Sequence, residues 1–193
     1  YDIYRHDYEE YVTGSTSTKI TANSTATTLF DSTFYVLTSD RNVYKCLDNA
    51  GNANSTVEPT GTSTSVITTG DGYKWKYIYT LSASEQSNFL STDFMAVTEN
   101  GSASGDQSNV ISAAVDCSIE VVKIKAAGSG GTNGTHTGVA IRGDGTGGVA
   151  SVTVAGGAVT AVTVTTPGSG YTFATISNAQ IVSAGATSLS GAE

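Results

Sequence analysis

The sequence holds few charged residues, and most of those are acidic. Only 13% of the residues are Asp, Glu, Lys or Arg, and nine basic side chains stand against seventeen acidic ones, for a formal net charge of −8. An average soluble protein carries about 25% charged residues. Binding to the phosphate backbone of nucleic acids depends on clustered Lys and Arg. The basic residues here form no cluster, so we do not expect nucleic acid as a partner.

Histidine, cysteine and long apolar runs are also scarce. Two His, two Cys and no C-x-x-C spacing argue against a structural zinc site. No apolar run approaches the roughly 18 residues of a membrane span, so we expect no membrane partner, and no signal peptide is visible. The chain starts on Tyr1 rather than Met and ends on Glu193, which leads us to expect a fragment of a longer polypeptide.

The two cysteines, Cys46 and Cys117, each lie in a stretch typical of a β-strand. We therefore expect two buried thiols. A disulfide between them cannot be derived from two isolated cysteines.

Thr, Ser, Gly and Asn supply the polarity instead. Thr and Val favour half-buried strands, and Gly and Asn favour turns, so the composition predicts an all-β or β-rich fold. We expect a β-sandwich-like domain with one short helix, whose start is marked by a capping box from Ser82 to Glu85. The remaining predicted elements are strands at 33–38, 43–47, 73–81 and 93–97, a polar loop at 48–65 and a linker at 98–109.

From residue 110 onward aromatic residues nearly vanish and Gly, Val, Ala and Thr dominate. Residues 119–132 align with 159–172 at an offset of 40 residues, and each copy ends in a Gly-Ser-Gly turn. Gly156–Gly157 between alternating apolar residues predicts a tight hairpin. The sequence thus predicts a β domain at 1–109, a Gly-rich β-hairpin module at 110–182, and a linker or tail at 183–193.

Few patterns point to chemistry. The GDGTGG stretch at 143–148 matches a nucleotide-binding pattern, but strand-like VASVTV follows it where a helix is needed, so we expect a turn. An Arg-Gly-Asp triplet at 142–144 is interpreted as a solvated loop. No nucleophile-and-base pattern is present, and we expect no enzyme, no cofactor and no metal. A glycosidase-like interpretation would need two carboxylates about 5–10 Å apart across a cleft.

The stretch DGYKWKYIYTL at 71–81 is the strongest functional candidate. Its aromatic residues alternate with Lys74, Lys76 and Ile78, so that on a strand Tyr73, Trp75, Tyr77 and Tyr79 share one face. An exposed row would suit stacking on sugars or bases. The lysines mark the opposite face as solvated, which favours a core wall or a subunit interface.

Three motifs occur in order between residues 43 and 81: NVYKCLD, an E-P loop and DGYKWKY. This order resembles the small baseplate wedge subunit of contractile-tailed, T-even-type phages. The matching residues are Val43, Tyr44, Lys45, Cys46, Leu47 and Asp48 in the first motif, Glu58 and Pro59 in the second, and Asp71, Gly72, Tyr73, Trp75 and Tyr77 in the third. The resemblance spans residues 1–100, including the aromatic stretch YDIYRHDYEEY. The module after it resembles Gly-Ser-Gly-Tyr insertions of cyanobacterial and marine phage structural proteins.

The resemblance implies a non-enzymatic virion protein of the tail baseplate, which is β-rich, forms a homodimer and binds other baseplate wedge subunits. It implies assembly in the host cytoplasm, in keeping with reduced cysteines. Its motif residues would be structural or interface residues, and no catalytic residue carries over. The alternative that we keep is a carbohydrate-binding or receptor-binding module of a phage tail, with either the aromatic row or the second module as its platform.

Overall fold

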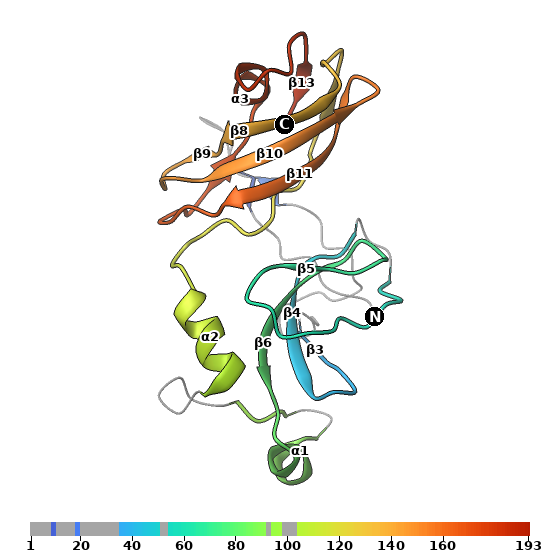
Figure 1. Ribbon diagram of the computed structural model, residues 1–193, viewed down its shortest axis with the longest axis vertical. Coiled ribbons are helices and arrows are strands. Elements are labelled where there is room, and N and C mark those ends of the chain that lie inside the picture. The colour runs from blue at the N-terminus through green and yellow to red at the C-terminus, as the bar shows by residue number, and fades with distance from the viewer. Residues whose placement is uncertain (1–8, 11–17, 20–34, 51–53, 92–93, 98–103) are drawn as a thin grey trace. The chain divides into compact units, whose positions relative to one another are not determined.

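The computed structural model describes residues 9–10, 18–19, 35–50, 54–91, 94–97 and 104–193 of the chain (Figure 1). Strands hold 36% and helices 15% of the described residues, so the β-rich class is confirmed. Residues 13–28, whose Thr-, Ser- and Asn-rich sequence is typical of a loop or an exposed edge, lie outside the described residues except for Thr18–Lys19. The chain divides into two compact units, unit 1 at Tyr1–Ala114 and unit 2 at Val115–Glu193.

Unit 1 is organised around a four-stranded antiparallel sheet in the order β3-β4-β6-β5 (Figure 1). The central strands pair Tyr44 with Tyr77 and Cys46 with Trp75. A separate two-stranded pair joins β1 to β2. The strands are β1 (Glu9–Glu10), β2 (Thr18–Lys19), β3 (Tyr35–Leu37), β4 (Asn42–Asp48), β5 (Ile67–Thr68) and β6 (Lys74–Thr80).

Strand β6 alternates between buried and half-buried residues, as its sequence predicts. Tyr73, Trp75 and Tyr77 are at most 1% exposed, whereas Lys74 and Lys76 are half-buried. The period of two therefore sorts aromatic rings to one face and amines to the other. The aromatic face packs with Val36, Tyr44 and Cys46 as one core, against which Val110 also packs.

Helix α1 (Ala83–Phe89) begins where the capping box predicts. The Ser82 hydroxyl accepts from the Glu85 N–H at 3.2 Å, and the Glu85 carboxylate accepts from the Ser82 N–H at 2.8 Å. Both bonds satisfy amide groups that the first helical turn leaves without partners.

Two expectations after this helix are wrong. Residues 94–97 do not form a strand, and the predicted linker contains helix α2 (Gly105–Ala113). Helix α2 packs against β6, and this packing moves the unit boundary from the predicted 109/110 to 114/115. Its amphipathic pattern is weak, because Ser, Asn and Gln occupy much of its length.

Unit 2 contains a three-stranded antiparallel sheet in the order β11-β10-β8 and two short strand pairs, β12-β9 and β13-β7 (Figure 1). Both glycines of the β10–β11 turn, Gly156 and Gly157, have positive φ, as the predicted tight hairpin requires. The elements are β7 (Ala127–Ser129), β8 (Gly134–Ala140), β9 (Arg142–Gly143), β10 (Val149–Ala155), β11 (Ala158–Thr166), β12 (Ala174–Thr175), α3 (Asn178–Ser183) and β13 (Ser190–Ala192).

The end of the chain is part of this unit and is not a linker or tail. Leu189 and Ala192 are buried in the same core as Val139, Val152 and Val154. Strand β13 pairs with β7, placing Ser190 opposite Ser129. The partner strand lies about sixty positions earlier in the sequence, which is why the local pattern did not reveal the pairing.

The two Gly-Ser-Gly turns of the sequence repeat share one backbone conformation. Gly128 and Gly168 have φ angles of 66° and 62°, and Gly130 and Gly170 have 75° and 72°. Side chains other than glycine rarely adopt such angles. The repeat does not extend to the preceding residues, because β11 is a strand whereas residues 119–125 are not.

Each turn also packs against a second backbone segment in the same way. A Cβ atom on Gly128 would lie 2.7 Å from the Ser190 carbonyl oxygen, and one on Gly168 would lie 2.5 Å from that of Thr146. Both distances are too short for a methyl group. Unit 2 therefore contains the same close contact of a turn glycine with a carbonyl oxygen twice.

Candidate functional site

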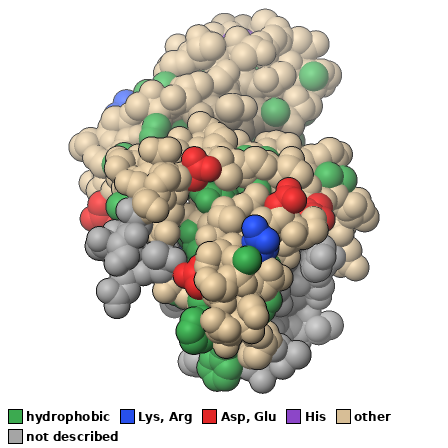
Figure 2. All heavy atoms as spheres, turned by 60° about the horizontal axis from the view of Figure 1, so that its bottom comes forward, with side chains coloured by type: hydrophobic (Ala, Val, Ile, Leu, Met, Phe, Trp, Pro, Cys, Tyr) green, Lys and Arg blue, Asp and Glu red, His purple; other side chains and the backbone are tan. Residues whose placement is uncertain are grey.

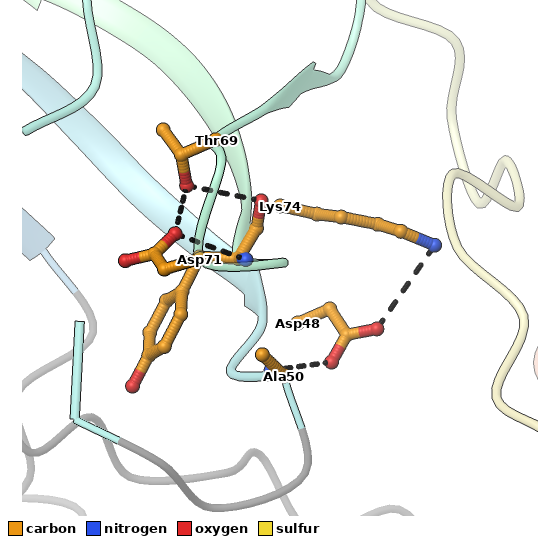
Figure 3. Close-up of polar contacts among 6 residues, drawn as sticks. Asp48, Ala50, Thr69, Asp71 and Lys74 are labelled. Carbon is orange, nitrogen blue, oxygen red and sulfur yellow. Dashed lines mark hydrogen bonds and ion pairs between the residues drawn. The ribbon is translucent and has the colours of Figure 1, made fainter. Parts of the chain in front are cut away.

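The three sequence motifs meet in unit 1, where they hold the loop at 54–66. Asp71, at the turn before β6, is the first attachment point, and Figure 3 shows its contact with Thr69 of the same turn. One of its carboxylate oxygens accepts from the Ser55 hydroxyl at 2.8 Å and from the N–H groups of Thr56 and Val57 at 2.8 and 3.1 Å. The other accepts from the Thr69 hydroxyl at 2.5 Å. One carboxylate thus joins the start of the loop to the turn.

These bonds fix the charge of Asp71. Desolvation acts to raise the pKa of the carboxyl, but the bonds from Thr69, Thr56, Ser55 and Val57 outweigh it and hold the pKa well below its usual value. Hydrogen bonds to the charged form favour that form. Asp71 is therefore an ionised anchor at neutral pH and has no proton to offer as a general acid.

Glu58 and Tyr44 attach the loop at two further points. The Glu58 carboxylate accepts from the N–H of Ser39 at 2.8 Å and from its hydroxyl at 2.9 Å. The Tyr44 hydroxyl donates to the Gly61 carbonyl at 2.6 Å. Pro59 lies between these points and is buried. The E-P motif and the tyrosine of β4 thus serve one purpose, which is to hold a long irregular loop against the sheet.

The aromatic row is a core wall. The rings of Tyr73 and Trp75 stack at 5.3 Å with 19° between their planes, and those of Tyr44 and Tyr77 meet edge to face at 5.8 Å. Trp75 donates its ring N–H to the Thr69 hydroxyl at 3.3 Å. Such pairs add specificity to the burial of apolar area. Because these rings are buried, none of them offers a face for stacking on a sugar or a base.

The remaining motif residues also have structural surroundings. Cys46 is buried and forms no disulfide within the described residues, and Leu47 is half-buried in β4. The Asp48 carboxylate accepts from the Ala50 N–H at 3.1 Å and lies 4.0 Å from the Lys74 amine (Figure 3). Gly72 has a φ of 85°, and a Cβ there would lie 3.2 Å from that of Ala50.

A pocket of about 230 Å³ lies where the E-P loop meets β3 and the turn after it. Val36, Leu37, Pro59 and Trp75 supply its apolar lining, and Thr38, Ser39, Ser55 and Glu58 supply its polar lining. The Glu58 carboxylate and the Ser55 hydroxyl already bond to neighbouring residues. We attribute this pocket to loop packing.

Several residues that complete this network have no sequence signal. Asn42 donates to the Tyr44 hydroxyl at 3.3 Å and accepts from the Thr80 hydroxyl at 2.5 Å, which in turn lies 2.8 Å from the Tyr77 hydroxyl. The hydroxyls of Ser55 and Thr69 donate hydrogen bonds to the Asp71 carboxylate. All are small polar residues in a chain rich in such residues, so nothing in the sequence distinguishes them from the others.

Side chains that could act as nucleophiles or metal ligands lie outside this hydrogen-bond network. Cys117 is exposed, contrary to the expectation of a buried thiol, because it lies in a turn with a φ of 51°. Its hydrogen bond to the Asp116 carboxylate raises the pKa of the thiol and thus disfavours the nucleophilic thiolate. Within the described residues, no three His, Cys, Asp or Glu side chains gather as a metal site, and no helix is long and apolar enough to cross a membrane.

The Arg-Gly-Asp and GDGTGG stretches comprise β9 and the segment 144–148 that connects it to β10. The Asp144 carboxylate accepts from the hydroxyl and the N–H of Thr172 and from the N–H of Phe173 at 3.2 Å. These bonds lower the pKa of Asp144 to about 2. A strand follows the stretch, so it lacks the helix that a dinucleotide site needs. Asp144 is thus an exposed residue whose carboxylate is already bonded to Thr172 and Phe173 of its own chain, which leaves it less available as an adhesion ligand.

Unit 1 exposes large apolar side chains near α1. Phe89 is 63% exposed, and Phe94 and Val97 are each 76% exposed. Figure 2 shows hydrophobic side chains gathered on the face where α1 lies. Large exposed apolar residues close together are typical of surfaces that bind other proteins.

Comparison of the chain with protein-family models, with curated proteins and with solved structures found no match in any of the three.

Proposed function

We propose that this chain is a structural subunit of a phage tail baseplate wedge that acts by binding neighbouring wedge subunits. The observation that carries the proposal is the role of the motif residues. Asp71, Glu58 and Tyr44 attach a long loop to a sheet through hydrogen bonds. Residues that fix a loop in one conformation suit a protein whose work is to present a surface, because a preorganised surface loses less entropy on binding.

The exposed side chains support association as the activity. Phe89, Phe94 and Val97 would serve as the anchors of an interface, since aromatic residues supply much of the binding energy in protein–protein contacts. In this proposal the protein is part of the virion, assembles in the host cytoplasm with Cys46 reduced, and forms a homodimer as well as contacts with other wedge subunits.

The test is the position of this chain on phage particles that contain it. Antibodies raised against the purified chain should label the baseplate ring in electron micrographs. Labelling of the capsid, or of the far tips of the tail fibres, would overturn the proposal. A second antibody against a capsid protein controls for access and for nonspecific labelling.

The alternative is a carbohydrate-binding or receptor-binding module of a phage tail. The aromatic row cannot supply its platform from within this chain, because Trp75 and Tyr77 are buried. The alternative now rests on unit 2, where a pocket bearing an arginine favours it. Labelling at fibre tips in the experiment above would favour this second function over the first.

A further inference from the structure

Unit 2 has a pocket of about 200 Å³ between strands β8 and β9 and helix α3. Its small lining residues are Gly138, Ala140, Ala179 and Ala184. A Cβ atom on Gly138 would meet no other atom within 4 Å, so this side of the pocket opens onto free space. The short side chains leave room for a group of roughly monosaccharide size.

The polar lining of this pocket consists of potential donors. It is formed by Arg142, Gln180 and Ser183, and no Asp or Glu among the described residues lines it. Arg142 has an exposed side chain that makes no hydrogen bond or ion pair with any described residue, and the hydroxyl of Ser183 likewise has no described partner. The pocket is therefore a positively charged spot in a chain of net charge −8.

Local structure holds these donors in place. The oxygen of the Gln180 side chain accepts from the N–H of Ser177 at 2.7 Å and from its hydroxyl at 2.5 Å, so the amide NH₂ group is left to donate. Arg142 lies in β9, where it pairs with Thr175 of β12. Two of the three donors thus extend from backbone that is fixed by capping or pairing bonds.

We propose that this pocket binds a small oxyanion, such as the carboxylate of an acidic sugar or the phosphate of a phosphorylated one. A guanidinium can pair with two oxygens of either group at once, and an amide and a hydroxyl beside it add donors to the same anion. The nearest carboxylate in the sequence, Asp144, is occupied by Thr172 and Phe173 and does not line the pocket. The site stands independently of the baseplate proposal, since it uses none of the residues of unit 1.

The experiment follows backbone amide signals of the full ¹⁵N-labelled chain by NMR during titration with glucuronate, with glucose and with inorganic phosphate. Glucuronate should shift the signals of Gly138, Ala179 and Ser183 with a millimolar dissociation constant, and glucose should not. Shifts at the same residues with phosphate would also support the site and would show that the anion alone suffices. Equal effects of glucuronate and glucose, or no shift at these residues with either anion, would overturn it.

Variants separate binding from folding. Arg142→Gln should weaken glucuronate binding roughly tenfold or more, and Lys123→Gln, which removes an exposed charge of the same unit outside the pocket, should leave it within about twofold. Ala179→Met keeps the arginine and fills the pocket from an exposed helix position, so it should abolish the shifts without unfolding the unit. Unchanged binding by both Arg142→Gln and Ala179→Met would refute the proposal.

Discussion

Replacing Asp71 by Ala should destabilise unit 1 by about 2–3 kcal/mol. The carboxylate accepts five hydrogen bonds, and the net cost of removing it is set mainly by the donors that are then left without a partner. The N–H groups of Thr56 and Val57 lie near the surface and can form hydrogen bonds with water after the substitution. The part-buried Thr69 hydroxyl and Tyr73 N–H cannot do so as easily, and they cost about 1 kcal/mol each.

The chain carries its own probe for this measurement. Trp75 is its single tryptophan and is buried in unit 1, so its fluorescence during urea denaturation reports on that unit and not on unit 2. The loss should lower the urea midpoint by about 1–2 M. The matched control is Asp40→Ala, which removes an exposed carboxylate of the same unit and should change stability by less than about 0.5 kcal/mol.

The pH dependence gives an independent check on Asp71. The pKa is lowered in the folded state, so the carboxylate contributes its full stability above the unfolded value of 3.8 and loses it as the pH falls toward the folded value. The difference between wild type and Asp71→Ala should thus be constant near neutral pH and shrink below pH 3.8. A loss equal to that of the Asp40 control, or a difference that does not change in acid, would refute the role given to this carboxylate.

Three further predictions concern single residues. Gly72→Ala should destabilise unit 1 by about 1–2 kcal/mol, because Gly72 has a positive φ and lies close to the Ala50 side chain. Gly61→Ala, at a similar φ but with no neighbour within 4 Å, should destabilise the unit less when unfolding is followed by tryptophan fluorescence. Equal losses of stability would show that the contact with Ala50 does not add to the cost. Tyr44→Phe should cost about 1 kcal/mol and speed protease cleavage within residues 54–66, because the hydroxyl no longer holds the loop; cleavage at the wild-type rate would contradict this. The Asp144 carboxyl should titrate near pH 2 by NMR. After Thr172→Val, which removes the hydroxyl donor but leaves the N–H groups of Thr172 and Phe173, it should titrate at a higher pH that is still below its usual value; a normal titration in the wild type would show that the turn is not closed this way.

Local patterns in the sequence predicted the local elements of this fold. The Ser82–Glu85 capping box and the Gly156–Gly157 turn are each decided by neighbours within a few residues, and both are present. The alternation around Trp75 predicted a buried face, which is also present. In these cases the residues that fix the structure are the ones that carry the pattern.

Structure that depends on residues far apart in the sequence could not be predicted in the same way. Helix α2 forms where Ser, Asn and Gln suggested a linker, because packing against β6 outweighs weak helix propensity. Burial of Ala192 depends on a partner strand far back in the chain. The Asp71 carboxylate bonds to residues fourteen to sixteen positions earlier, in a loop whose sequence has no recognisable pattern. Its role could therefore be seen only in the structure.

The pairing of β13 with β7 also bears on how unit 2 folds. Ser190 and Ser129 are separated by 61 positions, so the contact closes a long loop and must overcome the corresponding chain entropy. The hairpin of β10 and β11 has no such cost and can form first. During synthesis the core around Val152 would therefore stay open to solvent until the residues of β13 leave the ribosome, and this unit should fold late and slowly compared with its own hairpin.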